Sequence, residues 1–262
     1  MITQQRTAYQ TLGAEKKLTA TELTQYFRLN EEECYLFKRT LRTAHAKLTF
    51  AVHLKIFQYL GYFISDDKIP KSVIEFVSSQ LLIENTTVFG YQHSSMQYRH
   101  RERIRQWLNV IPWRMIDGKN KARRSAIKFA FEASRTMNFP VDIINIVIEQ
   151  CQKNHVELPA FNELVRLVRH CRSRTNNNLF TQIYSALTDT DKQQFDGLLI
   201  LPDGYGRTPF NKLKQLPHKP TITNIRNTIN HSEWLTALGD FRSSIAPLAQ
   251  CKLKQFSNEA RA

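Results

Sequence analysis

The chain has 262 residues, of which 42% are hydrophobic and 11% aromatic, so it is long enough and apolar enough to fold around a sizeable core. Lys and Arg number 37 against 23 Asp and Glu, which gives a formal net charge of +14 and favours a polyanionic partner. No run of 18 or more apolar residues occurs, and the N-terminal MITQQRTAYQ lacks the apolar stretch of a signal peptide. We therefore expect no membrane association and a cytoplasmic location, in association with the nucleoid.

The sequence offers no candidate catalytic or metal site. Its four cysteines, Cys34, Cys151, Cys171 and Cys251, are scattered without a CxxC pair, which predicts reduced thiols instead of a zinc site or a disulfide framework. No GxxxxGK[ST], HExxH or GxSxG motif occurs, and the acidic clusters at 31–33 and 66–67 lie where helix starts favour negative charge. We expect no enzyme activity, no metal, no cofactor and no small-molecule substrate.

The pattern of the first hundred residues predicts helices only. The chain holds just 8 Gly and 9 Pro, and no β-branched alternation bounded by hairpin turns is present. A first helix is predicted after Thr19 and a second from Asn30, which precedes three glutamates. The third, LTFAVHLKIFQYL, is apolar on most sides, ends at Gly61 and should form the core of this part, and Pro70 leads a fourth helix. The fold class is therefore all-α and multi-helical.

Further helices follow a boundary that we place near residues 112–118. PDGYGRTP at 202–209 is predicted to be a turn, and the three asparagines at 176–178 are a candidate break. The expected helices cover about 120–137, 140–154, 159–187, 189–200, 208–215 and 221–238, with an amphipathic stretch from about 244.

The segment RHRERIR, residues 99–105, places four arginines and a histidine within seven positions. Winding residues 96–111 as a helix predicts that Arg101 and Arg105 lie outward beside Tyr98, with Arg99 and Arg103 on the other flank. The side expected to face the core carries Met96, His100, Ile104, Trp107, Leu108 and Ile111, with His100 as a core histidine that makes one hydrogen bond, and Ser94 and Ser95 as helix caps. The arginines suit phosphates on either side of a groove, although a merely solvated charged face is the alternative.

Two more basic stripes follow at helical spacing. The second stripe, after that of residues 99–105, comprises Lys121, Arg124, Lys128 and Arg135, opposite Ala126, Phe129, Ala130 and Ala133. The third stripe lies in RLVRHCRSR, with Arg166, Arg169 and Arg172 expected outside and Leu164, Val165, Val168 and Cys171 inside. Because stacked like charges repel one another, these stripes indicate a counter-charged partner more than a gain in stability.

The order of these features resembles the N-terminal region of the TnpA-type transposases of the Tn-three transposon family. Five segments carry the resemblance: LTATELTQYFRLNEEE, LTFAVHLKIFQYLGYF, IPKSVIEFVSSQLLI, Tyr91 with His100 to Leu108, and LPAFNELVRLVR. The chain departs from the family pattern at Thr49, at Phe57 and Gln58, and at Asn109. These departures fit either a divergent member with an altered preference for the transposon end or a member that is no longer under selection.

The resemblance implies sequence-specific binding of double-stranded DNA at the terminal inverted repeats, by helix-turn-helix-like modules and as a non-catalytic part of DNA transposition. The family's catalytic acidic triad and its metal ions lie beyond the positions that this chain reaches, and a homodimer would form through the full-length transposase. We expect DNA-binding subdomains at 1–114 and 115–174, and a helical linker or the start of a next domain at 175–262. The candidate DNA contacts are Arg39, Arg42, Lys47, Arg99, Arg101, Arg103, Arg105, Lys121, Arg124 and Lys128, with Arg101 and Arg105 as the best candidates for reaching guanine edges.

Two other interpretations stay open. The basic stripes could dock an acidic protein or mediate self-assembly, in which case the chain is a helical protein–protein interaction module without specific DNA binding. Alternatively, Tyr91, Tyr98, Trp107 and Trp113 could stack the bases of a single strand, although Trp107 is expected to face inward.

Overall fold

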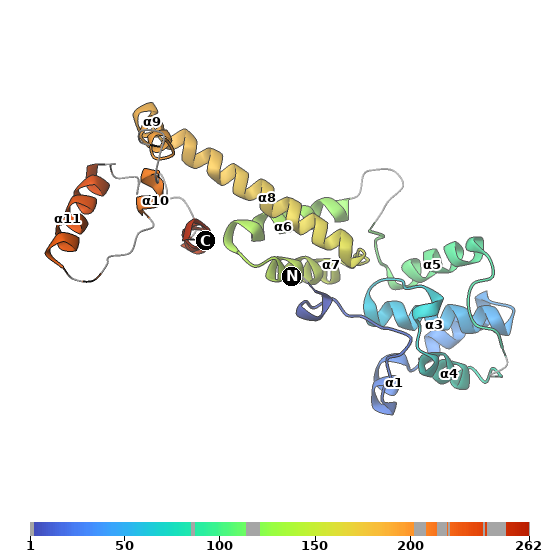
Figure 1. Ribbon diagram of the computed structural model, residues 1–262. Helices are drawn as coiled ribbons and strands as arrows, with labels where there is room; N and C mark the ends of the chain where they lie inside the picture. Colours follow the sequence, from blue (N-terminus) through green and yellow to red (C-terminus); the bar gives the residue numbers. More distant parts are fainter. Residues whose placement is uncertain are drawn as a thin grey trace. The chain divides into compact units, whose positions relative to one another are not determined.

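The computed structural model describes residues 3–84, 87–113, 121–201, 208–213, 219, 221–237, 239 and 250–261. Within these ranges every regular element is a helix (Figure 1), which confirms the predicted all-α class, and the β pairing is limited to one isolated bridge between Ile111 and Val156. The chain forms two compact units, the first made of 1–133 and 139–169 and the second of 134–138 and 170–262. The DNA-binding subdomains expected at 1–114 and 115–174 stay a prediction, because units of packing and units of DNA contact need not coincide.

The first two helices begin where their capping residues predict. Helix α1, Ala20–Phe27, starts after Thr19, whose hydroxyl accepts from the backbone N–H of Glu22 while the Glu22 carboxylate accepts from the Thr19 backbone. Helix α2, Glu31–Thr40, repeats this capping box with Asn30 and Glu33. Each cap satisfies backbone donors that would otherwise lack partners and typically stabilises the helix by about 1 kcal/mol.

Helix α3, Ala44–Leu60, forms the core of the first unit, as its apolar sequence predicts. All residues from Leu48 to Phe57 are buried, and the helix ends at Gly61, whose φ of 79° is left-handed. Helix α4, Lys71–Gln80, packs against it through Val73 and Val77. Pro70 precedes α4 as its N-cap and does not occupy its first turn. Burying each large side chain of such a core contributes about 1.5–3 kcal/mol.

A buried ion pair, Lys55 with Glu33, lies in this apolar region. The Lys55 ammonium of α3 donates to the Glu33 carboxylate at 2.9 Å, and the Gln58 amide donates to the same carboxylate at 2.8 Å. Lys55 and Glu33 are both buried. The charges are therefore matched inside the core, so Glu33 has a second role beyond capping α2.

Hydrogen bonds connect the later part of the first unit to its N-terminal part. Helix α5, Ser94–Leu108, is followed by α6, Lys121–Thr136, and α7, Pro140–Lys153; the predicted boundary near 112–118 lies mostly outside the described residues. Beyond α7, the Leu158 N–H donates to the Gly61 carbonyl at 2.9 Å and the Tyr9 hydroxyl donates to the Pro159 carbonyl at 2.9 Å.

Helix α8, Phe161–Ala186, continues without interruption from the first unit into the second. The asparagines at 176–178 are helical, so the candidate break there is wrong; the strong helix on both sides overrides their low propensity. The second unit also contains α9, Asp189–Gly197, α10, Pro209–Leu213, α11, Ile222–Ala237, and α13, Gln250–Arg261. The turn predicted at 202–209 lies mostly outside the described residues.

Candidate nucleic-acid interface

The arginine-rich helix α5 has defined ends that differ from the predicted ones at the start. Its N-cap position is taken by His93, which makes no side-chain capping bond, so the prediction that Ser94 or Ser95 caps the helix is wrong. At its C-terminus Asn109 adopts a left-handed φ of 52°, and the Val110 N–H donates to the Arg105 carbonyl at 2.8 Å. Asparagine tolerates this conformation, so it ends the helix as a glycine would.

The inner side of α5 packs on α3 through an aromatic contact. Ile104 and His100 are buried, and the His100 ring lies edge-on to Phe50 at 5.1 Å and to Tyr91 at 5.5 Å. Burial is the main cause that lowers the pKa of His100 from 6.5 to about 4, and His53 and the neighbouring arginines add to it. His100 is thus a neutral core histidine, as predicted, but its Nδ1 makes no hydrogen bond among the described residues, where one bond was expected.

Arg101 and Arg105 do not extend freely outward, contrary to the prediction. Both guanidinium groups lie 5.1 Å from the centre of the Phe63 ring, and both side chains are partly buried. Arg105 also donates to the Glu157 carboxylate through Nε at 2.9 Å and through a terminal nitrogen at 3.3 Å. This flank of α5 is therefore held in place by the α3–α4 loop and by the segment that precedes α8.

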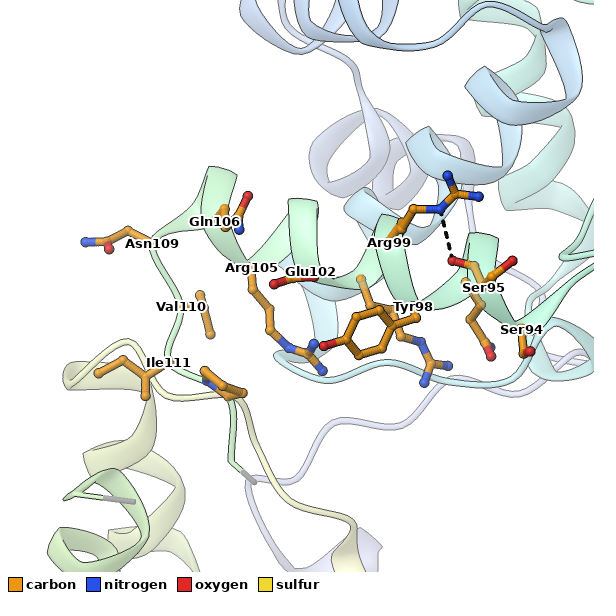
Figure 2. Close-up of a pocket in the computed structure, with 13 residues that line it drawn as sticks. Ser94, Ser95, Tyr98, Arg99, Glu102, Arg105, Gln106, Asn109, Val110 and Ile111 are labelled. Atoms are coloured by element: carbon orange, nitrogen blue, oxygen red, sulfur yellow. Dashed lines mark hydrogen bonds between the residues drawn. The ribbon is translucent and has the colours of Figure 1, made fainter. Parts of the chain in front are cut away.

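The solvent-facing side of α5 is a regular ridge. Ser95, Tyr98, Glu102 and Gln106 follow one another at intervals of three or four residues, and all four are exposed. They line a concave space of about 1180 Å³ along the helix, which the residues up to Pro112 help to enclose. Figure 2 shows Arg99 and Arg105 leaving the helix on different sides of this ridge. Arg99 and Arg103 are exposed and form the second flank, where the Arg99 Nε donates to the Ser95 carbonyl of the same helix at 3.3 Å.

The prediction that Trp107 faces inward is wrong. Its side chain is 41% exposed, and Ile111, which was also expected inside, is 45% exposed. Helical periodicity gave the direction of the apolar side correctly, because His100 and Ile104 are buried, but the protected stripe is narrower than the sequence suggests.

The other predicted cations lie on several helices of the first unit. Near the end of α2 and the start of α3, Arg39 and Arg42 are exposed and Lys47 is half-buried. On α6, Arg124 and Lys128 are exposed, and Lys128 lies 3.8 Å from Glu132; Lys121 starts this helix, but its side chain lies outside the described residues.

The third predicted stripe falls on α8. Arg166 and Arg169 are exposed and Arg172 is half-buried, while Leu164, Val165, Val168 and Cys171 are buried as expected. The opposite face of α6 likewise buries Ala126, Ala130 and Ala133. The second and third stripes therefore have the inner and outer sides that their spacing predicts, except that Phe129, expected inside, and Arg172, expected outside, are both partly buried.

Three cysteines and the acidic cluster at 66–67 have described surroundings. Cys34, Cys151 and Cys171 are free thiols, and burial raises the pKa of Cys151 to about 12 and that of Cys171 to about 11. Over the ranges that the structure covers, no group of three or more His, Cys, Asp or Glu side chains is arranged to hold a metal ion. Asp66 instead accepts from the His53 ring at 2.9 Å and from the Tyr91 N–H at 2.7 Å.

Helix α5, with its arginines and its exposed polar ridge, thus defines a cationic helical module. The chain belongs to the family described as Domain of unknown function (DUF4158), whose model matches residues 2–171. It is similar to the N-terminal part of several transposon transposases. None of the helices in the described ranges has the length and apolar character needed to cross a membrane.

Three relatives illustrate this similarity. The transposase for transposon Tn1546 of Enterococcus faecium is 22% identical over 97% of the chain and 25% of its own length. The transposase for transposon Tn501 of Pseudomonas aeruginosa is 25% identical over 82% of the chain and 21% of its own length. The transposase for transposon gamma-delta of Escherichia coli K12 is 25% identical over 75% of the chain. The chain spans only a fifth to a quarter of the length of these relatives.

Proposed function

We propose that this chain binds double-stranded DNA at the terminal inverted repeats of a transposon, as the non-catalytic N-terminal part of a transposase. The observation that carries the proposal is the exposed polar ridge of α5 between two arginine flanks, on a chain with a net charge of +14. An exposed helix with this composition fits the major groove, where flanking cations meet phosphates. The similarity to transposases supplies the reason to expect transposon ends as the DNA.

The ten predicted DNA contacts are retained as proposed contacts but differ in how freely they can move. Exposed side chains can reorient toward a phosphate at little cost in free energy. Partly buried side chains contact only a phosphate that lies next to their fixed position. The exposed group comprises Arg39, Arg42, Arg99, Arg103, Arg124 and Lys128; the partly buried group comprises Lys47, Arg101 and Arg105; Lys121 completes the set. The anchoring of Arg101 and Arg105 on Phe63 favours phosphate contact over base reading.

A protein–protein assembly module is the second candidate, and helix α11 favours it. Ile222, Ile225 and Ile229 are exposed at intervals of three and four residues, a spacing that lets one helix pack on another. The full-length transposase could dimerise through such a surface. This candidate predicts that the basic residues of α5 have no measurable role in DNA affinity.

The test compares two double variants that remove the same charge. Arg99→Ala/Arg103→Ala removes the exposed arginine flank of α5, whereas Arg6→Ala/Arg28→Ala removes two exposed arginines elsewhere in the first unit. Fluorescence anisotropy on a transposon-end duplex should show weaker binding and a salt slope smaller by about 1.8 for the α5 variant.

The matched control should keep nearly the wild-type slope. Equal losses in the two variants would reduce the role of α5 to general charge and contradict the proposal. A single-stranded competitor that displaces the duplex at equal concentration would favour single-strand binding, for which exposed Tyr98 and Trp107 provide stacking groups.

A further inference from the structure

The exposed ridge of α5 contains a feature that charge attraction does not explain. Glu102 lies near its centre, with Tyr98 one turn before it and Gln106 one turn after it. In the described part of the chain, Glu102 makes no ion pair, although Arg99, Arg103 and Arg105 are close in sequence. It therefore neither anchors the helix nor neutralises a particular arginine.

A carboxylate at this place weakens general DNA binding. The arginines on both sides of the ridge are arranged to meet phosphates, and a negative charge between them opposes the approach of a polyanion. Such a residue improves discrimination only where it meets a matching donor, because on every other sequence its charge stays unpaired. The N4 amino group of cytosine is such a donor in the major groove, whereas the N6 amino group of adenine lies beside the N7 acceptor, which repels a carboxylate.

Gln106 supplies a second reader on the same line. Its side chain is exposed and, like Glu102, it lines the concave space along α5 (Figure 2). A glutamine amide pairs in a bidentate manner with the N6 and N7 edge of adenine. Four residues of helix rise cover about 6 Å, which corresponds to roughly two base-pair steps of about 3.4 Å each.

Glu102 and Gln106 lie between the two arginine flanks of α5. Arg101 and Arg105 are held on Phe63 at one side, while Arg99 and Arg103 lie exposed on the other. If both flanks meet phosphates across a groove, the ridge between them faces the base edges.

We propose that Glu102 and Gln106 are the sequence-reading residues of α5, and that they select a cytosine and an adenine about two base pairs apart in the major groove. This inference rests on the proposed DNA-binding function and deepens it by naming the bases that are read. It moves base reading from Arg101 and Arg105 to the uncharged and acidic ridge between the arginines.

The experiment is a binding-site selection from a pool of random-sequence duplexes, followed by anisotropy on the enriched duplex and on a scrambled one. Wild type should enrich a motif that contains the cytosine and the adenine. Glu102→Gln should change the preferred base at the first position from cytosine to adenine, and Glu102→Ala should lose that preference while it binds scrambled duplex more tightly. Gln106→Ala should lose only the adenine preference, with the ratio of cognate to scrambled affinity falling about 5- to 140-fold in either alanine variant.

Glu149→Gln, which removes an exposed carboxylate from α7, is the matched control and should enrich the wild-type motif. If wild type and the Glu102 variants enrich the same motif, the base assignment is overturned while DNA binding by the chain stands. If wild type binds every duplex equally, with affinities that fall together as salt rises, the base assignment also fails and only phosphate attraction remains. If wild type retains no duplex, the proposed function fails together with this inference.

Discussion

The buried imidazole of His100 should make the stability of the first unit depend on pH. His100 is 6% exposed, its ring lies against Phe50 and Tyr91, and burial is the main cause that lowers its pKa from 6.5 to about 4. The folded pKa lies below the unfolded one, so the unfolded chain takes up the proton first as the pH falls. The contribution of His100 to stability is therefore complete above about pH 7, declines from about pH 6.5, and stops declining below about pH 4.

The two pKa values give the size of this effect. At pH 5 the unfolded imidazole is almost fully protonated and the folded one is mostly neutral, which corresponds to a loss of about 2 kcal/mol relative to pH 7.5. Urea unfolding followed by circular dichroism at the two pH values should show that His100→Leu loses about 2 kcal/mol less than wild type. His170→Leu, at an exposed position of α8, is the control and should behave like wild type. Equal losses for wild type and His100→Leu would refute this explanation of the buried ring.

Three further changes test the packing that positions α5. Lys55→Met leaves the Glu33 carboxylate buried without its cation and should lower the free energy of unfolding in urea by about 3–5 kcal/mol. Glu33→Gln/Lys55→Met should recover most of this loss, and equal stability of the two variants would contradict the expectation. A double-mutant cycle with Arg105→Ala and Glu157→Gln should give a coupling energy of about 1–2 kcal/mol, whereas additive effects would mean that the ion pair does not hold the flank. Gly61→Ala places a Cβ 3.2 Å from a leucine side chain at a φ of 79° and should lower the melting temperature by about 2–8 °C; an unchanged value would show that the turn relaxes freely.

The parts of the fold that follow from local chemistry could be predicted from the sequence. The starts of α1 and α2 depend on Thr19 and Asn30 and on a glutamate three residues later, and the end of α3 depends on Gly61. Each signal acts within one helical turn, so neighbouring residues in the sequence contain the necessary information.

The environment of the arginines could not be predicted, because it depends on partners far along the chain. Arg105 pairs with Glu157, 52 positions away, and Phe63 comes from the loop after α3. A helical wheel also shows the direction of the buried side without its width, which is why Trp107 was misplaced. The ridge around Glu102 is found only once these contacts show which arginines are anchored.

The proposed recognition of a transposon end by sequence can be tested directly. The most direct measurement is the affinity of the chain for a terminal inverted-repeat duplex and for a scrambled duplex, by fluorescence anisotropy across a salt series. Specific recognition predicts a preference for the true end that persists as salt rises, because base contacts release fewer counterions than phosphate contacts do. Affinities that are equal for the two duplexes at every salt concentration would contradict it.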